Sequence, residues 1–117
     1  MLIGGKNKIN ENLQKEIRDL QPVRLVDYKD FLKDRFPPSP YQPKIIFINL
    51  IDVGTCEVQI LSKIKVDFKD SRTIALHFAE VPLMIKNTLA KGYDAYIPIF
   101  KFSEELRNIV SRLSITK

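Results

Sequence analysis

The sequence predicts an α/β protein in which a five-stranded parallel sheet carries helices on both faces. Short apolar runs alternate with amphipathic segments five times along the chain. This alternation is typical of parallel strands that are joined by right-handed helical crossovers. The central run, residues 44–50 (KIIFINL), has no polar residue between Ile45 and Ile48, which indicates a strand that is buried on both faces.

The expected strands are short and mostly apolar. They cover residues 1–3, 23–26, 44–50, 72–78 and 94–100. Pro98 lies in the last of them and has no N–H group to donate to a neighbouring strand, so we expect this strand at the edge of the sheet. Four prolines fall within residues 37–43, which we expect to form a loop.

The expected helices have apolar residues at every third or fourth position. They cover residues 8–20, 27–36, 57–66, 82–92 and 103–113. Asp27 and Ser103 are the candidate N-caps of the second and last helices. In the third helix, Val58, Leu61 and Ile64 are expected to share one buried face.

The composition excludes several classes of protein. A chain of 117 residues with 44% hydrophobic and 28% charged residues suits one domain, residues 1–117, and is neither fibrous nor disordered. One cysteine, Cys56, excludes an internal disulfide framework and favours a reducing compartment. The start resembles no signal peptide and no apolar run is long enough to span a bilayer, so we expect a soluble, cytoplasmic protein.

Five residues lie at the expected carboxyl ends of the strands, where parallel α/β sheets place their functional crevice. They are Gly4, Gly5, Asn49, His77 and Ile99. Along the chain, 44 positions separate Gly5 from Asn49, 28 separate Asn49 from His77, and 22 separate His77 from Ile99.

These spacings are similar to those of the receiver domain of two-component response regulators, which has the chemotaxis-type, flavodoxin-like fold. The resemblance covers essentially all 117 residues. Residues 90–97 (AKGYDAYI) resemble the family's Gly-Ala-x-x-Tyr stretch, and residues 100–110 (FKFSEELRNIV) resemble the start of its last helix. The resemblance implies the strand order 2-1-3-4-5.

The same resemblance implies a degenerate phosphorylation pocket, because receivers carry an acidic pair, a phosphoacceptor Asp, a Ser or Thr and a Lys at these positions. Gly4 and Gly5 supply no side-chain oxygen for Mg²⁺. The Asn49 amide is no nucleophile for phosphoryl transfer. His77 replaces the hydroxyl residue, and Ile99 leaves no cation to pair with phosphate. We therefore expect a pseudo-receiver that is not an enzyme and holds no cofactor or metal.

The resemblance implies a signalling or regulatory protein-interaction module that works without phosphorylation. In typical receivers the output surface is formed by the fourth helix, the fifth strand and the fifth helix. We expect a protein partner or a homodimer to bind there, through Ile85, Leu89, Tyr96, Pro98, Phe102, Glu105 and Ile109. With the phosphorylation relay lost, Tyr96 should be held in one rotamer by packing.

Two other functions stay open. The emptied pocket, Gly4, Gly5, Asn49 and His77, is the alternative site, for a small polar or anionic ligand bound without metal. Direct nucleic-acid binding is not expected, because no strand combines aromatic and basic residues as such sites do. A net charge of +5 is ordinary for a solvated basic surface.

Simpler structural interpretations also exist for the single residues. Asn49 satisfies loop amides at a strand end, and His77 and Cys56 are structural, since neither has a metal-binding or catalytic partner nearby in sequence. Asp27 and Asp52 are interpreted as capping and turn residues rather than as a metal-binding pair.

Overall fold

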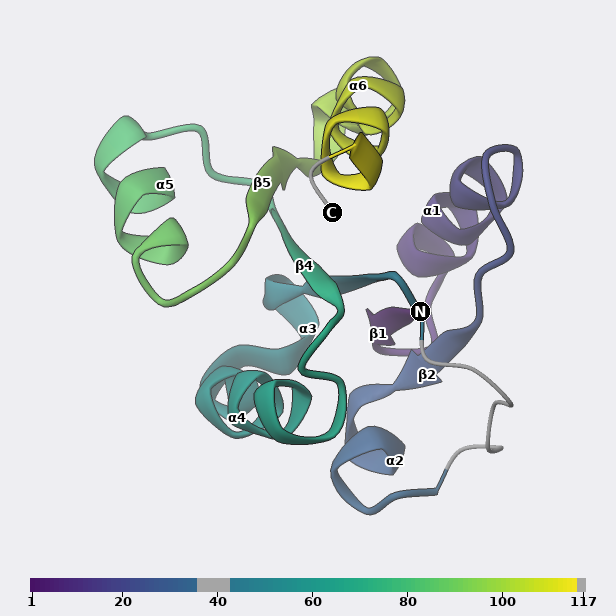
Figure 1. Ribbon diagram of the computed structural model, residues 1–117, viewed down its shortest axis with the longest axis vertical. Coiled ribbons are helices and arrows are strands. Elements are labelled where there is room, and N and C mark those ends of the chain that lie inside the picture. The colour runs from purple at the N-terminus through teal and green to yellow at the C-terminus, as the bar shows by residue number, and fades with distance from the viewer. Residues whose placement is uncertain (36–42, 116–117) are drawn as a thin grey trace.

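A parallel sheet with the strand order β2-β1-β3-β4-β5 forms the centre of the computed structural model (Figure 1). The structure describes residues 1–35 and 43–115, with side chains described up to residue 113. The strands are β1 (Leu2–Gly4), β2 (Leu25–Asp27), β3 (Ile45–Asn49), β4 (Arg72–His77) and β5 (Ala95–Pro98). The predicted fold class, the strand order and the edge position of β5 are confirmed. Of the predicted loop 37–43, residues 37–42 lie outside the described residues.

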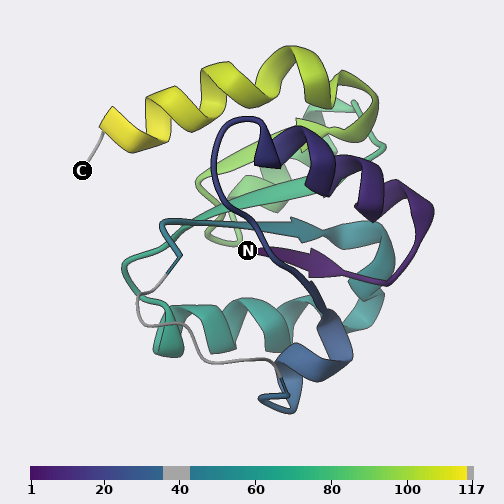
Figure 2. The same cartoon turned by 90° about the vertical axis from the view of Figure 1, so that its right-hand side faces the viewer.

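Helices lie on both faces of the sheet (Figure 2). They are α1 (Lys8–Arg18), α2 (Tyr28–Leu32), α3 (Leu50–Val53), α4 (Glu57–Asp67), α5 (Pro82–Leu89) and α6 (Phe102–Ile115), with the 3-10 helices η1 (Gly54–Cys56) and η2 (Ile99–Lys101). One core cluster joins the sheet to α1 and α6. The other joins it to α2, α3 and α4. No helix in the described part of the chain is long and apolar enough to cross a membrane.

The two cores explain why β3 is apolar throughout. Successive strand residues point to opposite faces, so Ile46 and Ile48 enter one core while Ile45 and Phe47 enter the other. The Phe47 ring meets the ring of Phe102 edge to face, with 6.1 Å between centroids. Full burial of such side chains contributes about 1.5–3 kcal/mol each to the stability of the fold.

Three local predictions need correction. Val58 is 70% exposed, since the buried face of α4 is formed by Ile60, Leu61 and Ile64. Ser103 does not cap α6, because η2 precedes this helix and the Ser103 hydroxyl is hydrogen-bonded to the carboxylate of Glu16. The last strand ends at Pro98 rather than at residue 100, and α3 and η1 were not predicted.

The predicted cap at the second helix is confirmed. The Asp27 carboxylate accepts a hydrogen bond from the Lys29 N–H at 2.9 Å. It thereby satisfies one of the backbone donors that a helix leaves unpaired in its first turn.

Candidate functional site

A network of side-chain amides and one carboxylate fills the carboxyl ends of β1 and β3. Asn49 Nδ2 donates to Asn10 Oδ1 at 2.8 Å. Asn10 Nδ2 in turn donates to the Gly5 carbonyl at 2.5 Å and to Asp52 Oδ2 at 2.6 Å. Asn10 is 0% and Asn49 2% exposed, so this link between distant parts of the chain is shielded from water. Breaking one such buried hydrogen bond costs about 1–3 kcal/mol.

Asp52 completes the network, which we call the Asn10–Asp52 network. Besides Asn10, its carboxylate accepts hydrogen bonds from the Gly5 N–H at 2.9 Å and from Asn7 Nδ2 at 3.2 Å. Asn7 also caps α1, because its Oδ1 accepts from the Asn10 N–H at 2.9 Å. The loop after β1 is therefore tied to the start of α3 by side chains from both segments.

The two glycines provide the room that this network needs. A Cβ atom at Gly4 would lie 2.6 Å from Asn10 Nδ2 and 2.9 Å from Asp52 Oδ2. At Gly5 the nearest atom would be Asn7 Nδ2, at 3.3 Å. The space that a side chain of Gly4 would occupy is thus already filled by polar groups that bond to one another.

Both ends of the Asn49 amide have structural partners. While Nδ2 donates to Asn10, Oδ1 accepts from the Ile51 N–H at 3.1 Å and caps α3. An ionised carboxylate at this position could accept from Ile51 but could not donate to Asn10. This agrees with the structural interpretation of Asn49.

His77 and Ile99 lie in the neighbouring strand ends and serve other contacts. His77 Nδ1 accepts a hydrogen bond from the Ala79 N–H at 3.2 Å, which closes the turn after β4. Ile99 begins η2 and packs, partly buried, against the core on the α6 side of the sheet. No hydrogen bond between described residues joins either of them to the Asn10–Asp52 network.

The site offers little to a metal ion. Within residues 1–35 and 43–113, no three side chains of His, Cys, Asp and Glu gather as a metal site requires. The one carboxylate present, Asp52, is surrounded by N–H donors, which repel a cation. Cys56 is a free, partly buried thiol, and Asp27 serves as the cap of α2.

Tyr96 is held in place by packing together with one hydrogen bond. Its side chain is 9% exposed, and its hydroxyl donates to the Ala79 carbonyl at 2.6 Å. Burial raises the pKa of the phenol, and the nearby Glu80 carboxylate raises it further. The expected fixed Tyr96 therefore has a polar anchor that the sequence did not predict.

Much of the expected partner surface forms one groove, which we call the output groove. It has a volume of about 330 Å³ and lies between α5, β5 and α6. Five of its lining residues were expected there: Ile85, Leu89, Tyr96, Glu105 and Ile109. Its other lining residues are Asp94, Ala95, Asn108 and Arg112.

Two of the expected surface residues need correction. Phe102 is 2% exposed because its ring packs against Phe47 in the core on the other side of β5. Pro98 is buried, and it pairs in register with His77 of β4. Neither lines the output groove.

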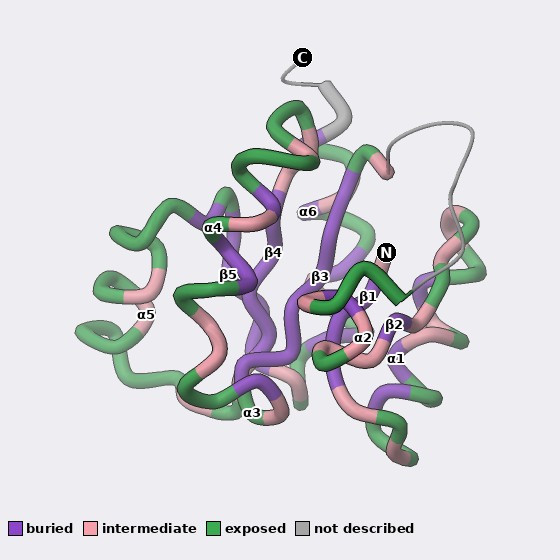
Figure 3. Tube along the Cα trace, turned by 90° about the horizontal axis from the view of Figure 1, so that it is seen from below, coloured by how far each residue is buried: buried purple, intermediate pink, exposed green. Residues whose placement is uncertain are grey.

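Helix α5 contributes an exposed apolar edge beside this groove. None of its side chains is buried, and Figure 3 shows the helix exposed along most of its length. Leu83 is 65% and Met84 46% exposed. Phe78 and Phe100, which follow β4 and β5, are also exposed. Exposed apolar side chains are typical of protein interfaces where they form one patch.

Sequence reasoning missed Asn7 and Asn10 as members of the site. Their spacing of three positions is a detectable signal, because the side chain of an N-cap Asn commonly accepts a hydrogen bond from the backbone N–H three residues later. Their contact with Asp52 carries no such signal, since it joins segments that are 42 or more positions apart.

Comparisons with known proteins find solved structures that are similar to this chain. No protein-family model and no curated protein matches the chain. The response regulator RcsB of Salmonella typhimurium matches with a TM-score of 0.72 and 15% identity, over 99% of this chain and 61% of RcsB. The bacteriophytochrome response regulator RtBRR matches with a TM-score of 0.70 and 11% identity, over 96% and 75% of the two chains.

A third match is the response regulator RPA3017, described in red light signalling of R. palustris, with a TM-score of 0.63 and 18% identity over 92% and 88% of the two chains. This chain thus spans less than two thirds of RcsB but most of the other two proteins. At these sequence identities the similarity establishes the fold, and the activity has to be argued from the residues of the site. The chain has the fold of response-regulator receiver domains.

Proposed function

We propose that this chain is a signalling or regulatory protein-interaction module that works without phosphorylation and has no catalytic activity of its own. The observation that carries the proposal is the Asn10–Asp52 network. It fills the space beside Gly4 with groups that bond to one another. We also propose a cytoplasmic location, for which the support comes from the sequence.

The chemistry of the network supports the absence of phosphoryl transfer. Forming an acyl phosphate needs a carboxylate oxygen that attacks phosphorus, whereas Asn49 offers an amide that is engaged at both ends. Mg²⁺ needs oxygen ligands, and the Asp52 carboxylate already accepts three hydrogen bonds. An incoming phosphate would also find no cation to pair with at residue 99, since Ile99 is apolar.

The output groove supports the proposed interaction. Its lining combines the apolar side chains of Ile85, Leu89 and Ile109 with polar ones, and it lies beside the exposed edge of α5. At its wall, Glu105 Oε2 is buried and has no hydrogen-bond partner among the described residues. A buried oxygen of this kind is satisfied in most proteins, and a donor from a bound partner would supply the missing bond.

Two variants test the groove against a more exposed apolar site elsewhere. Leu89→Glu places a charge in the output groove, while Val66→Glu places one on α4, where Val66 is 77% exposed. We expect Leu89→Glu to weaken self-association or partner binding at least about tenfold. The reason is that binding would remove the new carboxylate from water, which costs free energy. Val66→Glu should change it less than about twofold, and both variants should keep the fold because both sites are exposed.

Self-association is measured by sedimentation of the pure chain, and partner binding by affinity capture from native lysate followed by titration of the captured protein. The proposal requires that one of the two occurs without any phosphodonor. Equal effects of both variants, or a monomer that captures nothing, would contradict it.

The alternative of a small ligand held by Gly4, Gly5, Asn49 and His77 gains no support from the geometry. The glycines border filled space, and Asn49 and His77 are each engaged by neighbouring groups.

A further inference from the structure

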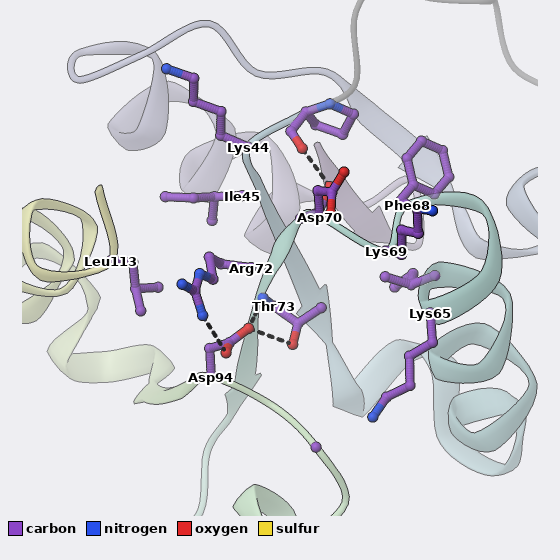
Figure 4. A pocket seen from close by; sticks show the side chains of 14 residues that line it. Lys44, Ile45, Lys65, Phe68, Lys69, Asp70, Arg72, Thr73, Asp94 and Leu113 are labelled. Carbon is purple, nitrogen blue, oxygen red and sulfur yellow. Dashed lines mark hydrogen bonds and ion pairs between the residues drawn. The ribbon is translucent and has the colours of Figure 1, made fainter. Parts of the chain in front are cut away.

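A larger pocket, of about 750 Å³, opens at the amino ends of β3 and β4, at the edge of the sheet opposite the Asn10–Asp52 network (Figure 4). Its walls come from the end of α4 with the turn that follows, from the turn before β5, and from Leu113 of α6. Ile45, Ile64 and Phe68 give it an apolar lining. We call it the basal pocket.

Basic residues surround the basal pocket from three separate segments. They are Lys44 before β3, Lys65 and Lys69 near the end of α4, and Arg72 at the start of β4. Two acids, Asp70 and Asp94, also line it. The basal pocket therefore has an excess of positive charge.

One of the two acids is already compensated by the protein. Asp94 Oδ2 accepts from the Thr73 N–H at 2.8 Å and from the Thr73 hydroxyl at 3.4 Å. Asp94 Oδ1 lies 3.5 Å from a guanidinium nitrogen of Arg72. By contrast, the side chains of Lys44, Lys65 and Lys69 form no ion pair or hydrogen bond with any described residue. Three ammonium groups thus stay available to a ligand.

Gly92 makes room for one of these ammonium groups. A Cβ atom at Gly92 would lie 2.3 Å from Lys65 Nζ and 3.1 Å from Lys65 Cε. Lys65 therefore lies against the turn before β5, across the pocket from Lys44 in Figure 4. The Gly92 backbone has a φ of 115°, so any other residue there would also be strained.

The end of α4 explains only part of this charge. The carbonyl end of a helix attracts cations, which accounts for Lys65 and Lys69 without a ligand. It does not account for Lys44, which precedes β3, whereas Arg72 is paired with Asp94. Since the cations surround a hollow rather than follow a stripe, the arrangement favours a compact anion over an extended nucleic acid.

We infer that the basal pocket binds a small molecule with several adjacent phosphate groups. Phosphate oxygens can each accept a charge-assisted hydrogen bond from an ammonium group. Inorganic tripolyphosphate and nucleoside triphosphates share this chemistry. The apolar lining at Phe68 would add affinity only for the second class. The inference is independent of the proposed output groove.

The test is calorimetric titration of the pure chain with inorganic tripolyphosphate and, separately, with ATP, at low ionic strength and without divalent cations. The site variant is Lys44→Ala/Lys65→Ala. The control, Lys15→Ala/Lys86→Ala, removes the same charge from exposed positions on α1 and α5. We expect the site variant to weaken binding at least about tenfold and the control less than about twofold.

A rise in the melting temperature of about 3 °C or more at saturating tripolyphosphate, lost in the site variant, would support the same conclusion. Tighter binding of ATP than of tripolyphosphate would assign the apolar wall to a nucleoside, and equal binding would restrict recognition to the phosphates. Equal weakening in both double variants, or no binding, would overturn the inference. So would single-stranded DNA that binds more tightly than tripolyphosphate and depends on the same lysines.

Discussion

Replacing Asn49 with Asp is expected to lower the free energy of unfolding by about 2–4 kcal/mol at pH 7. The change restores the residue type that receivers use as phosphoacceptor, yet here it removes the only donor that Asn10 Oδ1 has in the network. The new carboxylate would replace a residue that is 2% exposed and would face the Asn10 oxygen. The Asn10 amide could rotate to donate to it, but Asp52 and the Gly5 carbonyl would then lose their shared donor.

The loss should depend on pH in a defined direction. Burial and the missing donor raise the pKa of the substituted carboxyl above the value of about 3.9 that it has in the unfolded chain. Between these two pKa values the folded variant binds more protons than the unfolded chain, so its stability falls as the pH rises. Below about pH 4 both states are protonated, and the neutral acid can donate to Asn10 as the amide does.

Urea unfolding of Asn49→Asp between pH 3.5 and pH 8, measured beside the wild type, tests both statements. Asn87→Asp is the matched control, because Asn87 is exposed on α5. It should change stability by less than about 0.5 kcal/mol at any pH. A variant as stable as the wild type at pH 7, or a deficit that does not shrink toward pH 4, would contradict the structural assignment of Asn49.

Replacing Gly4 with Ala is expected to cost about 2–3 kcal/mol, and Gly5→Ala less than about 1 kcal/mol. The methyl group at Gly4 would overlap Asn10 Nδ2 and Asp52 Oδ2, which three hydrogen bonds hold in place. At Gly5 the closest atom is 3.3 Å away, in the side chain of Asn7. Neither glycine needs its special backbone freedom, so the difference reports on space alone.

Thermal and urea unfolding of the two alanine variants measure this difference directly. The structures of both should keep the strand order, since the change is confined to the ends of β1 and β3. Equal stabilities for Gly4→Ala and Gly5→Ala would contradict the claim that the Asn10–Asp52 network leaves no room for a side chain at residue 4.

The positions of the strands could be predicted because buried parallel strands have a strong local signature, whereas their order was implied by the resemblance to receiver domains. The run from Ile45 to Ile48 lies between two cores, and this alone makes it apolar at every position. Helix faces were harder to assign. Val58 was placed on the buried face because it lies three residues before Leu61, although the register of α4 turns it to solvent.

The location of the site at the ends of the strands could be predicted, but the side chains that fill it could not. Spacing placed Gly4, Gly5 and Asn49 at one edge of the sheet, as the structure does. The side chains that fill that edge, Asn10 and Asp52, come from the first turns of α1 and α3, and no local pattern predicts that they meet. Phe102 was misplaced for a related reason: η2 sets the start of α6, and this turn directs the ring into the core.

Independence from phosphorylation is tested most directly by the intact mass of the chain after incubation with acetyl phosphate and Mg²⁺. A receiver domain that carries its acidic residues serves as the positive control in the same reaction. We predict that this chain gains no phosphoryl group while the control does, because Asn49 offers no carboxylate oxygen to attack phosphorus and the Asp52 carboxylate is already engaged by N–H donors. A phosphoryl adduct on this chain would contradict the proposed function.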